Sequence, residues 1–251
     1  MTDLSGKVAL VTGSARGIGK AIAVRYAQLG ADIAINYSGD EANASRTVAE
    51  IGDIGRDAIA VKADITKPAE IERLFTETLG RFGKLDIVVA NAGVELVDQP
   101  ILETTEEQFD RLFAINTKGT FFTLQKAAKY VSDNGRIICV GSSTTCNPVS
   151  GVGLYGASKM AGQYVVGVLG REIGKRGVTV NTILPTVIAD AGVFTDMDDD
   201  HPYRTLMQNF RPIGGRLGHP GDVADPAEYF ASDIAGWVSG QHLLISGGAQ
   251  Q

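Results

Sequence analysis

The sequence predicts an α/β fold built on one doubly wound parallel sheet, and two observations carry that prediction. Seven short apolar runs rich in β-branched residues recur along the 251-residue chain. Longer segments with helical periodicity separate them, and this alternation implies right-handed crossovers with helices on both faces of a parallel sheet. No linker, repeat or low-complexity tract interrupts the pattern, so we expect a single domain over residues 1–251.

The predicted strands are continuously apolar, which is typical of strands buried on both faces. They lie at 7–12, 32–37, 58–63, 85–90, 136–141, 178–184 and 242–247. Long helices are expected near 105–131 and 155–175. The alternation stops between the sixth and seventh strands, where an insertion at about 186–215 is expected to form a lid over a ligand site.

Composition excludes several function classes. The net charge is −6 and no dense cluster of lysine and arginine occurs, which argues against a nucleic-acid or anionic-membrane surface. No apolar run reaches 18 residues and the first residues do not resemble a signal peptide, so we expect a cytoplasmic protein whose partners are a small molecule or another subunit. Cys139, Cys146 and three isolated histidines match no metal motif, and the aspartates at 196 and 198–200 are expected to be a solvated loop face, so no metal site is predicted.

A glycine-rich stretch, VTGSARGIGK, follows the first predicted strand. Gly13, Gly17 and Gly19 have the spacing GxxxGxG at a strand-to-helix junction. Glycines at such a junction let the backbone turn tightly and approach a pyrophosphate at the start of a helix. They could form a tight turn and nothing more, but their position in an alternating chain favours nucleotide binding.

A tyrosine and a lysine stand one helical turn apart in GLYGASKMAG. Tyr155 and Lys159 therefore project from the same helix face. As an isolated pair they would be interpreted as surface residues, because the spacing is common by chance. Their context changes that interpretation: Ser142 lies thirteen residues before Tyr155, directly after a predicted strand, and Asn116 lies within a predicted helix, where asparagine is unfavourable.

Taken in order, these stretches resemble the signature of the short-chain dehydrogenase/reductase family, whose fold is Rossmann-like. The stretches are TGSARGIG at 12–19, ANAG at 90–93, Asn116 in FAINTKG, Ser142 after RIICVG, and YGASK at 155–159, and the similarity extends over nearly the whole chain. Within the family, SARGIG, INY and GKLDIVVANAG are similar to the 3-oxoacyl reductases and fungal naphthol reductases.

The resemblance implies a reversible reduction of a ketone to a secondary alcohol. Tyr155 would protonate the carbonyl oxygen, and Lys159 would lower the pKa of that tyrosine and bind the nicotinamide ribose. Ser142 would hold the substrate oxygen, and Asn116 would position a water in a proton relay.

The implied substrate is an apolar ketone. Its pocket would be lined by Val94, Glu95, residues 144–153 and the insertion. Apolar residues of the insertion would form a lid or, equally, the core contacts of a short helix; they are Phe194, Met197, Leu206 and Met207.

The cofactor that the resemblance implies is NADP(H) in preference to NAD(H). The second strand ends in Asn36, Tyr37 and Ser38 without a carboxylate, and Arg16 could meet a 2′-phosphate, although it could also be a solvent-exposed loop residue. Asp40 and Glu41 lie close enough to keep NAD(H) open. The residues assigned to cofactor binding are Gly13, Ser14, Arg16, Gly17, Ile18, Gly19, Asn36, Tyr37, Ser38, Asp64, Ile65, Asn91, Ala92, Gly93, Tyr155, Lys159, Pro185, Thr186 and Ile188.

Three residues depart from the family pattern. Thr186 replaces a glycine, Asp190 replaces a threonine, and Ser246 is a milder change. The resemblance also implies a homotetramer that pairs the two long helices. Two alternatives remain: an NAD-dependent alcohol dehydrogenase of the same family, and a regulatory protein that binds NADP(H) without catalysis, although the latter has no need of Tyr155 together with Lys159.

Overall fold

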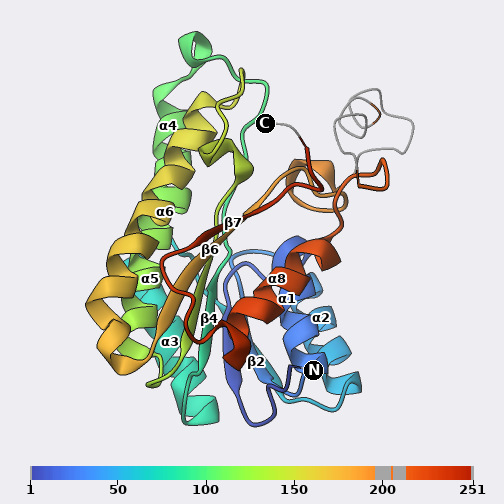
Figure 1. Ribbon diagram of the computed structural model, residues 1–251, viewed down its shortest axis with the longest axis vertical. Helices are drawn as coiled ribbons and strands as arrows, with labels where there is room; N and C mark the ends of the chain where they lie inside the picture. Colours follow the sequence, from blue (N-terminus) through green and yellow to red (C-terminus); the bar gives the residue numbers. More distant parts are fainter. Residues whose placement is uncertain (1, 196–204, 206–212, 250–251) are drawn as a thin grey trace.

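The seven predicted strands form one parallel sheet in the order β3-β2-β1-β4-β5-β6-β7 (Figure 1). The computed structural model describes residues 2–195, 205 and 213–249. The strands are β1 (Val8–Val11), β2 (Asp32–Tyr37), β3 (Ala58–Lys62), β4 (Ile87–Ala90), β5 (Arg136–Val140), β6 (Thr179–Pro185) and β7 (His242–Ile245). The order reverses between β1 and β4, which confirms the doubly wound fold.

Helices cover both faces of this sheet (Figure 1). They are α1 (Gly17–Gln28), α2 (Glu41–Asp53), α3 (Pro68–Phe82), α4 (Glu106–Leu112), α5 (Thr120–Tyr130), α6 (Gly153–Ile173) and α8 (Pro220–Ala231). In the part of the chain that the structure describes, no helix is long and apolar enough to cross a membrane.

The core consists of two apolar layers, one on each face of the sheet. Ala9 and Val11 of β1 pack into the layer under α1 and α8, whereas Val8 and Leu10 pack into the layer under α3, α5 and α6. This alternation is the two-residue period of a strand, and it explains why a strand with apolar residues at every position is stable here.

The two edge strands differ from the sequence prediction of burial on both faces. Ala60 and Lys62 of β3 are exposed, and so are Leu243 and Leu244 of β7. β3 and β7 are the two edge strands of the sheet, and side chains on their faces are left uncovered in the single chain.

The segment predicted as one helix near 105–131 has three parts. A capping box between Thr105 and Gln108 starts α4, and α5 ends at Tyr130. Between them, the π-helical segment η2 (Phe113–Gly119) carries Asn116 at its centre. A π segment widens the helix by one residue per turn and often marks a functional site, and here it turns a buried asparagine toward the carboxyl edge of the sheet.

The beginning and the end of the insertion after β6 lie side by side. Ile188 and Gly218 form a parallel bridge, and the Ala189 amide donates to the Gly218 carbonyl at 2.8 Å. Phe194, at the end of the short 3-10 helix η5 (Gly192–Phe194), is buried. Met197, Leu206, Met207 and the aspartates at 196 and 198–200 lie outside the described residues.

Candidate active site

The loops that follow β1 and β4 meet at the point where the strand order reverses. The Thr12 hydroxyl accepts hydrogen bonds from the Asn91 and Ala92 amides, both at 3.0 Å. The Asn91 side chain donates to the carbonyl oxygens of Thr12 and Gly13, at 2.9 and 3.1 Å. The predicted glycine loop and the predicted ANAG turn are therefore one hydrogen-bonded unit in the place where α/β sheets bind ligands.

Glycine is required in this unit because the backbones touch. Gly13 has a φ of +62°, and a Cβ there would lie 2.8 Å from Ala92 Cα. A Cβ on Gly19 would lie 2.5 Å from the Gly13 carbonyl oxygen and 2.5 Å from Asn91 Nδ2. Both contacts are shorter than real Cβ atoms make, so any other residue would push the loops apart.

The N-terminus of α1 is open to an anion. The helix begins at Gly17 after Arg16, whose backbone is extended and whose side chain makes no capping hydrogen bond, and the first turn has no acidic residue. The first amide groups of a helix lack partners within the helix and favour negative charge. This end of α1 therefore fits a phosphate group, as the sequence predicted for Gly17, Ile18 and Gly19.

Two of the predicted cofactor residues have side chains that are occupied within the protein. The Ser14 hydroxyl donates to the Val11 carbonyl at 2.7 Å and is fully buried. The buried Asn36 side chain accepts from the Gly13 amide at 3.1 Å and donates to the Ala63 carbonyl at 3.0 Å. These side chains hold the backbone of the glycine loop in place, so they would act on a cofactor only indirectly.

The end of β2 carries polar side chains, and the carboxylate that follows it is already hydrogen-bonded within the protein. Arg16 and Ser38 are exposed and Tyr37 is half-buried. Asp40 is the N-cap of α2 and accepts from the Asn43 amide at 3.1 Å and from the Asn43 side chain at 2.6 Å. These hydrogen bonds from Asn43 lower the pKa of the Asp40 carboxyl, and the charge of Arg16 lowers it further. Of the two acids that kept NAD(H) open, Asp40 is thus already used to cap a helix, whereas Glu41 is exposed in the first turn of that helix.

Of the two predicted cofactor residues after β3, Asp64 is partly exposed and Ile65 is buried. One Asp64 oxygen accepts from the amide and the hydroxyl of Thr66, at 3.0 and 2.8 Å, while its carboxylate stays partly exposed. Ile65 is buried, and a Cβ on Gly119 would lie 2.8 Å from its side chain. Ile65 therefore packs on the π segment that carries Asn116.

Asn116 is held by three hydrogen bonds. Its Oδ1 accepts from the Val94 amide at 2.9 Å, and its Nδ2 donates to the Val94 carbonyl and to Ser158 Oγ, each at 2.9 Å. The Ser158 hydroxyl in turn donates to the Tyr155 carbonyl at 2.7 Å. Asn116 thus ties the end of β4 to the helical turn that presents Tyr155.

Tyr155 and Lys159 are buried neighbours, as the spacing predicted. Lys159 Nζ lies 6.0 Å from the centre of the Tyr155 ring and 3.4 Å from the Val140 carbonyl oxygen. A Cβ on Gly93 would lie 2.7 Å from this Nζ and 3.1 Å from Asn116 Oδ1, so the absence of a side chain at Gly93 makes room for both groups. Burial lowers the pKa of the Lys159 ammonium.

The pKa of Tyr155 is raised above its ordinary value, and the lowering by Lys159 that the resemblance implies stays a prediction. Burial raises the pKa of the phenol, the negative charge of Glu95 raises it further, and a hydrogen bond with Ser142 lowers it. Burial disfavours the charged form of both groups, the phenolate of Tyr155 and the ammonium of Lys159. Tyr155 therefore holds its proton, as a proton donor must.

A small apolar cluster, separate from the two core layers, surrounds the tyrosine. Leu112, Leu154 and Tyr155 are its buried members, with Val94, Leu96 and Phe113 packed against them. Ser142, also buried, accepts from the Thr144 amide at 3.3 Å and the Thr144 hydroxyl at 3.0 Å. The phenol of Tyr155 and the hydroxyl of Ser142 thus meet at an apolar surface.

The residues at and after the end of β6 are buried or half-buried at first, and the chain then reaches the surface at Asp190. Pro185 and Ile188 are buried, and the Thr186 amide donates to the Ile245 carbonyl at 3.1 Å. Asp190 is exposed with a φ of +58°. It lines a groove on the outer side of α1, so this departure from the family pattern faces solvent beside the helix.

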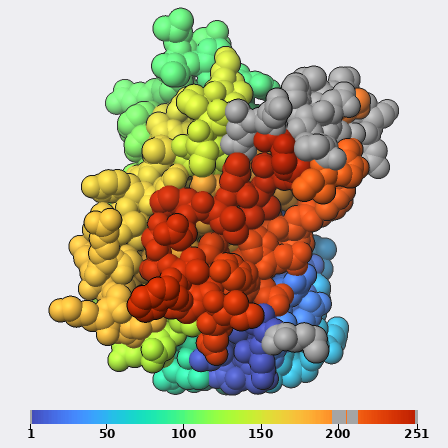
Figure 2. Space-filling model, viewed as in Figure 1, coloured from blue at the N-terminus to red at the C-terminus, as the bar shows by residue number. Residues whose placement is uncertain are grey.

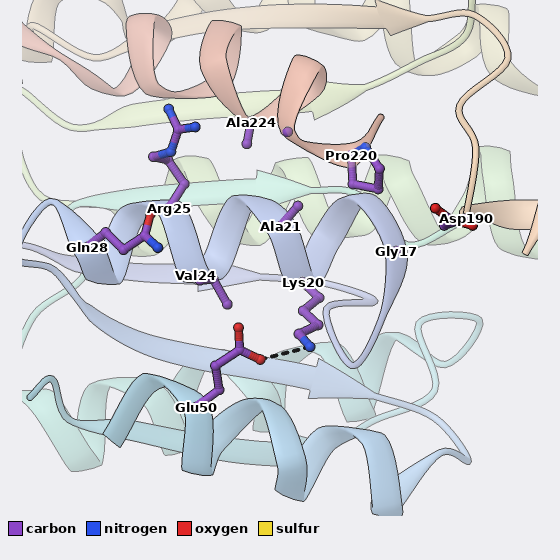
Figure 3. A pocket seen from close by; sticks show the side chains of 11 residues that line it. Gly17, Lys20, Ala21, Val24, Arg25, Gln28, Glu50, Asp190, Pro220 and Ala224 are labelled. Carbon is purple, nitrogen blue, oxygen red and sulfur yellow. Dashed lines mark ion pairs between the residues drawn. The ribbon is translucent and has the colours of Figure 1, made fainter. Parts of the chain in front are cut away.

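Figure 3 shows that groove, which lies between α1, α2 and α8 and has a volume of about 340 Å³. Three of its charged side chains are paired: Lys20 with Glu50 at 2.8 Å, and Arg25 with Glu228, just outside the lining, at 2.8 Å. Its lining includes none of Asn116, Ser142, Tyr155 and Lys159, so it is distinct from the reaction site.

Sequence reasoning assigned no role to two buried hydroxyls that organise the site. Thr12 joins the glycine loop to the ANAG turn, and Ser158 joins Asn116 to the Tyr155 turn. Both stand inside motifs that the sequence displays, directly before Gly13 and directly before Lys159. Their positions within these motifs indicate a role at the site, but their hydrogen-bond partners are known only from the fold.

The chain matches a known family over most of its length. A family model described as enoyl-(acyl carrier protein) reductase matches residues 13–250. The hydroxynaphthalene reductase-like protein Arp2 of Metarhizium brunneum is 40% identical over 265 residues, which cover 98% of this chain and 96% of that protein. The short chain dehydrogenase claC of Passalora fulva is 38% identical, with 98% and 95% covered.

Solved structures agree with this. A dehydrogenase/reductase from Sinorhizobium meliloti 1021 superposes with a TM-score of 0.92 at 36% identity and covers 99% of this chain and 97% of its own. A short chain dehydrogenase from Burkholderia cenocepacia J2315, solved in complex with NADP, gives a TM-score of 0.90 at 35% identity, with 98% of each chain covered. Fold, motifs and relatives coincide, and the chain belongs to the short-chain dehydrogenase/reductase family of oxidoreductases, with hydroxynaphthalene reductase-like proteins among its relatives.

Proposed function

We propose that this protein is an NADP(H)-dependent reductase that converts an apolar ketone to a secondary alcohol, reversibly, with Tyr155 as the proton donor. One observation carries the proposal: a buried phenol with a raised pKa lies beside Ser142 at an apolar surface, with Lys159 one helical turn away. A binding or regulatory protein would have no use for this combination.

The residues around the sheet edge fit a nicotinamide dinucleotide. Gly13 and Gly19 form a cradle in which a Cβ would clash, the start of α1 offers unpartnered amides, and Lys159 lies beside Gly93. These groups would hold the pyrophosphate and the ribose. When bound, the cofactor supplies the hydride of the reduction.

The protein's own residues would control the substrate oxygen and the proton. Ser142 would donate a hydrogen bond to the carbonyl and place it near the Tyr155 hydroxyl. Tyr155, kept neutral by burial and by Glu95, would transfer its proton to the oxygen as negative charge develops there. Asn116 would hold the Tyr155 turn in place through Ser158.

The choice of NADP(H) rests on the end of β2 and on relatives. Asp40 is used to cap α2, which leaves exposed Arg16 to meet a 2′-phosphate. The Burkholderia cenocepacia relative was solved with NADP, and a blue fluorescent protein from a metagenomic library that is 34% identical was solved with NADPH. Equal use of NADH would contradict this part of the proposal.

The decisive experiment is a panel of ketones with NADPH and with NADH, followed by loss of absorbance from the reduced cofactor. The panel should include fused aromatic ketones, because the surface around Tyr155 is apolar and the Arp2 relatives are named as hydroxynaphthalene reductase-like. Cofactor binding without turnover of any ketone would favour the regulatory alternative.

We also propose a homotetramer. Tyr164 and Val168 on α6 and Trp237 and Leu243 near the carboxyl end of the chain are exposed, at 76%, 39%, 100% and 39%. Figure 2 shows α6 beside the C-terminal segments on one face, and a Cβ added at Gly240 would lie 4.0 Å from Gly167 Cα. Exposed large apolar side chains of this kind mark protein contacts. A monomeric mass at micromolar concentration would contradict the proposal.

A further inference from the structure

Glu95 connects two segments that are far apart in the sequence. It stands two residues after Gly93, and one of its carboxylate oxygens, Oε2, accepts a hydrogen bond from the Val193 amide at 2.9 Å. Val193 belongs to η5, the short helix that follows β6. The contact therefore joins the loop after β4 to the segment after β6, across the carboxyl edge of the sheet.

Gly192 is shaped for this contact. Its φ is +57°, a conformation that residues with a side chain rarely adopt, and a Cβ there would lie 2.2 Å from Glu95 Oε2. The backbone thus turns the Val193 amide toward the carboxylate and leaves room for it. Both the donor and the space next to it depend on a glycine at 192.

The contact lies beside the reaction group. The two sequence neighbours of Glu95, Val94 and Leu96, pack against the apolar cluster that contains Tyr155. Phe194, the residue after Val193, is buried. The carboxylate that binds η5 is thus flanked, in the loop after β4, by two residues that pack against the cluster containing the tyrosine.

We infer that Glu95 is a positioning residue for the reaction: its carboxylate fixes η5 beside Tyr155 and so forms one wall of the substrate site. The inference rests on the proposed function for its catalytic consequence, but the contact itself can be measured without turnover. Charge-assisted hydrogen bonds of this kind are stronger than neutral ones, which suits a short segment of three residues.

The carboxylate would have a second, separable effect through its charge. Glu95 after β4 and Ser142 after β5 shift the pKa of Tyr155, Lys159 lies 6.0 Å from the ring centre, and Ser158 donates to the Tyr155 carbonyl. The side chains that α4 and η2 pack against it, Leu112 and Phe113, carry no charge. Glutamine at 95 would keep an oxygen for Val193 but remove the negative charge.

Amide hydrogen exchange tests the contact directly. Glu95→Ala should speed exchange at Val193 about 10-fold, because the amide loses its acceptor, whereas Glu95→Gln should leave it near the wild-type rate. Glu103→Ala is the matched control, since it removes an exposed glutamate of η1 and should change nothing at Val193. Unchanged exchange in Glu95→Ala would overturn the inference.

Kinetics test the consequence. Glu95→Ala should raise the KM for the ketone about 10-fold, and Glu95→Gln should restore it. In Glu95→Gln, the alkaline loss of ketone reduction should move to lower pH, because removal of the negative charge lowers the pKa of Tyr155 and the phenol loses its proton earlier. If glutamine behaves like alanine in both KM and exchange, the oxygen is not the acceptor and the inference fails.

A glycine variant breaks the same contact from the other side. Gly192→Ala should reproduce the exchange and KM effects of Glu95→Ala, whereas Gly6→Ala, which has a similar φ of +71° and open space, should not. Active Tyr155→Phe would defeat the proposed function while the exchange result at Val193 still stood. Loss of activity in Tyr155→Phe with no effect in either Glu95→Ala or Gly192→Ala would defeat only the inference.

Discussion

The two halves of the candidate site use the chain in opposite ways. In the proposed cofactor half, around residues 12–19 and 90–92, the backbone would meet the ligand, and the side chains of Ser14 and Asn36 are turned inward to hold that backbone. In the reaction half, buried side chains carry the function, and glycines such as Gly93 serve to make room for them.

This difference teaches what each half can tolerate. A methyl group added at Gly13 or Gly19 of the cofactor half meets backbone atoms at less than 3 Å. A removed atom in the reaction half takes away a proton, a hydrogen bond or a charge. Added atoms should therefore do the most damage in the cofactor half, and removed atoms in the reaction half. The following variants test that contrast.

The largest effect is expected from Tyr155→Phe. Loss of the hydroxyl removes the proton donor without changing the shape of the apolar cluster, so turnover should fall by about 10³-fold while the thermal unfolding midpoint stays unchanged. Steady-state kinetics and a melting curve measure both. Turnover close to that of the wild type would refute Tyr155 as the donor.

Gly13→Ala should be the next most damaging change. The new Cβ would lie 2.8 Å from Ala92 Cα in a backbone of φ +62°, so the two loops must separate and NADPH binding should weaken by about 100-fold. Titration by cofactor fluorescence measures it. Gly6→Ala is the control, because it has the same backbone strain far from any neighbour.

Asn116→Ala should reduce stability as well as activity. The variant leaves the Val94 amide and carbonyl without their partner, and unmade buried hydrogen bonds cost about 1–3 kcal/mol of unfolding free energy. Denaturant unfolding measures this cost. If Asn116→Ala is as stable as the wild type, the asparagine does not hold the two segments together.

The smallest effect is expected at the exposed edge of the cofactor half. Arg16→Ala should reduce the preference for NADPH over NADH by about 10-fold, because a solvent-exposed guanidinium contributes modestly to phosphate binding. NADH kinetics should be unchanged. A loss that is equal for both cofactors would mean that Arg16 acts on the loop and not on the 2′-phosphate.

The sequence predicted the fold, and the shared helix face of Tyr155 and Lys159, for identifiable reasons. Each of the seven apolar runs is a strand, because a strand between two helical layers must be apolar at successive positions. Tyr155 and Lys159 share a helix face because helical spacing is local geometry. Local patterns of this kind can be predicted from the sequence because they depend only on residues that are close together along the chain.

Other features depend on contacts between distant segments. The π segment at Phe113–Gly119 could not be separated from an ordinary helix, because its shape follows from what Asn116 and Ile65 contact. The buried roles of Ser14 and Asn36 and the raised pKa of Tyr155 likewise depend on neighbours up to dozens of residues away.

By itself, the sequence determined the alternation of strands and helices, the glycine positions at the sheet edge and the spacing of Ser142, Tyr155 and Lys159. Only the tertiary structure decided that Asp40 caps a helix, that Tyr155 keeps its proton and that Glu95 reaches Val193, 98 residues away. The physical reason is that periodicity is a property of neighbours along the chain, whereas burial and charge act between groups that only folding brings together.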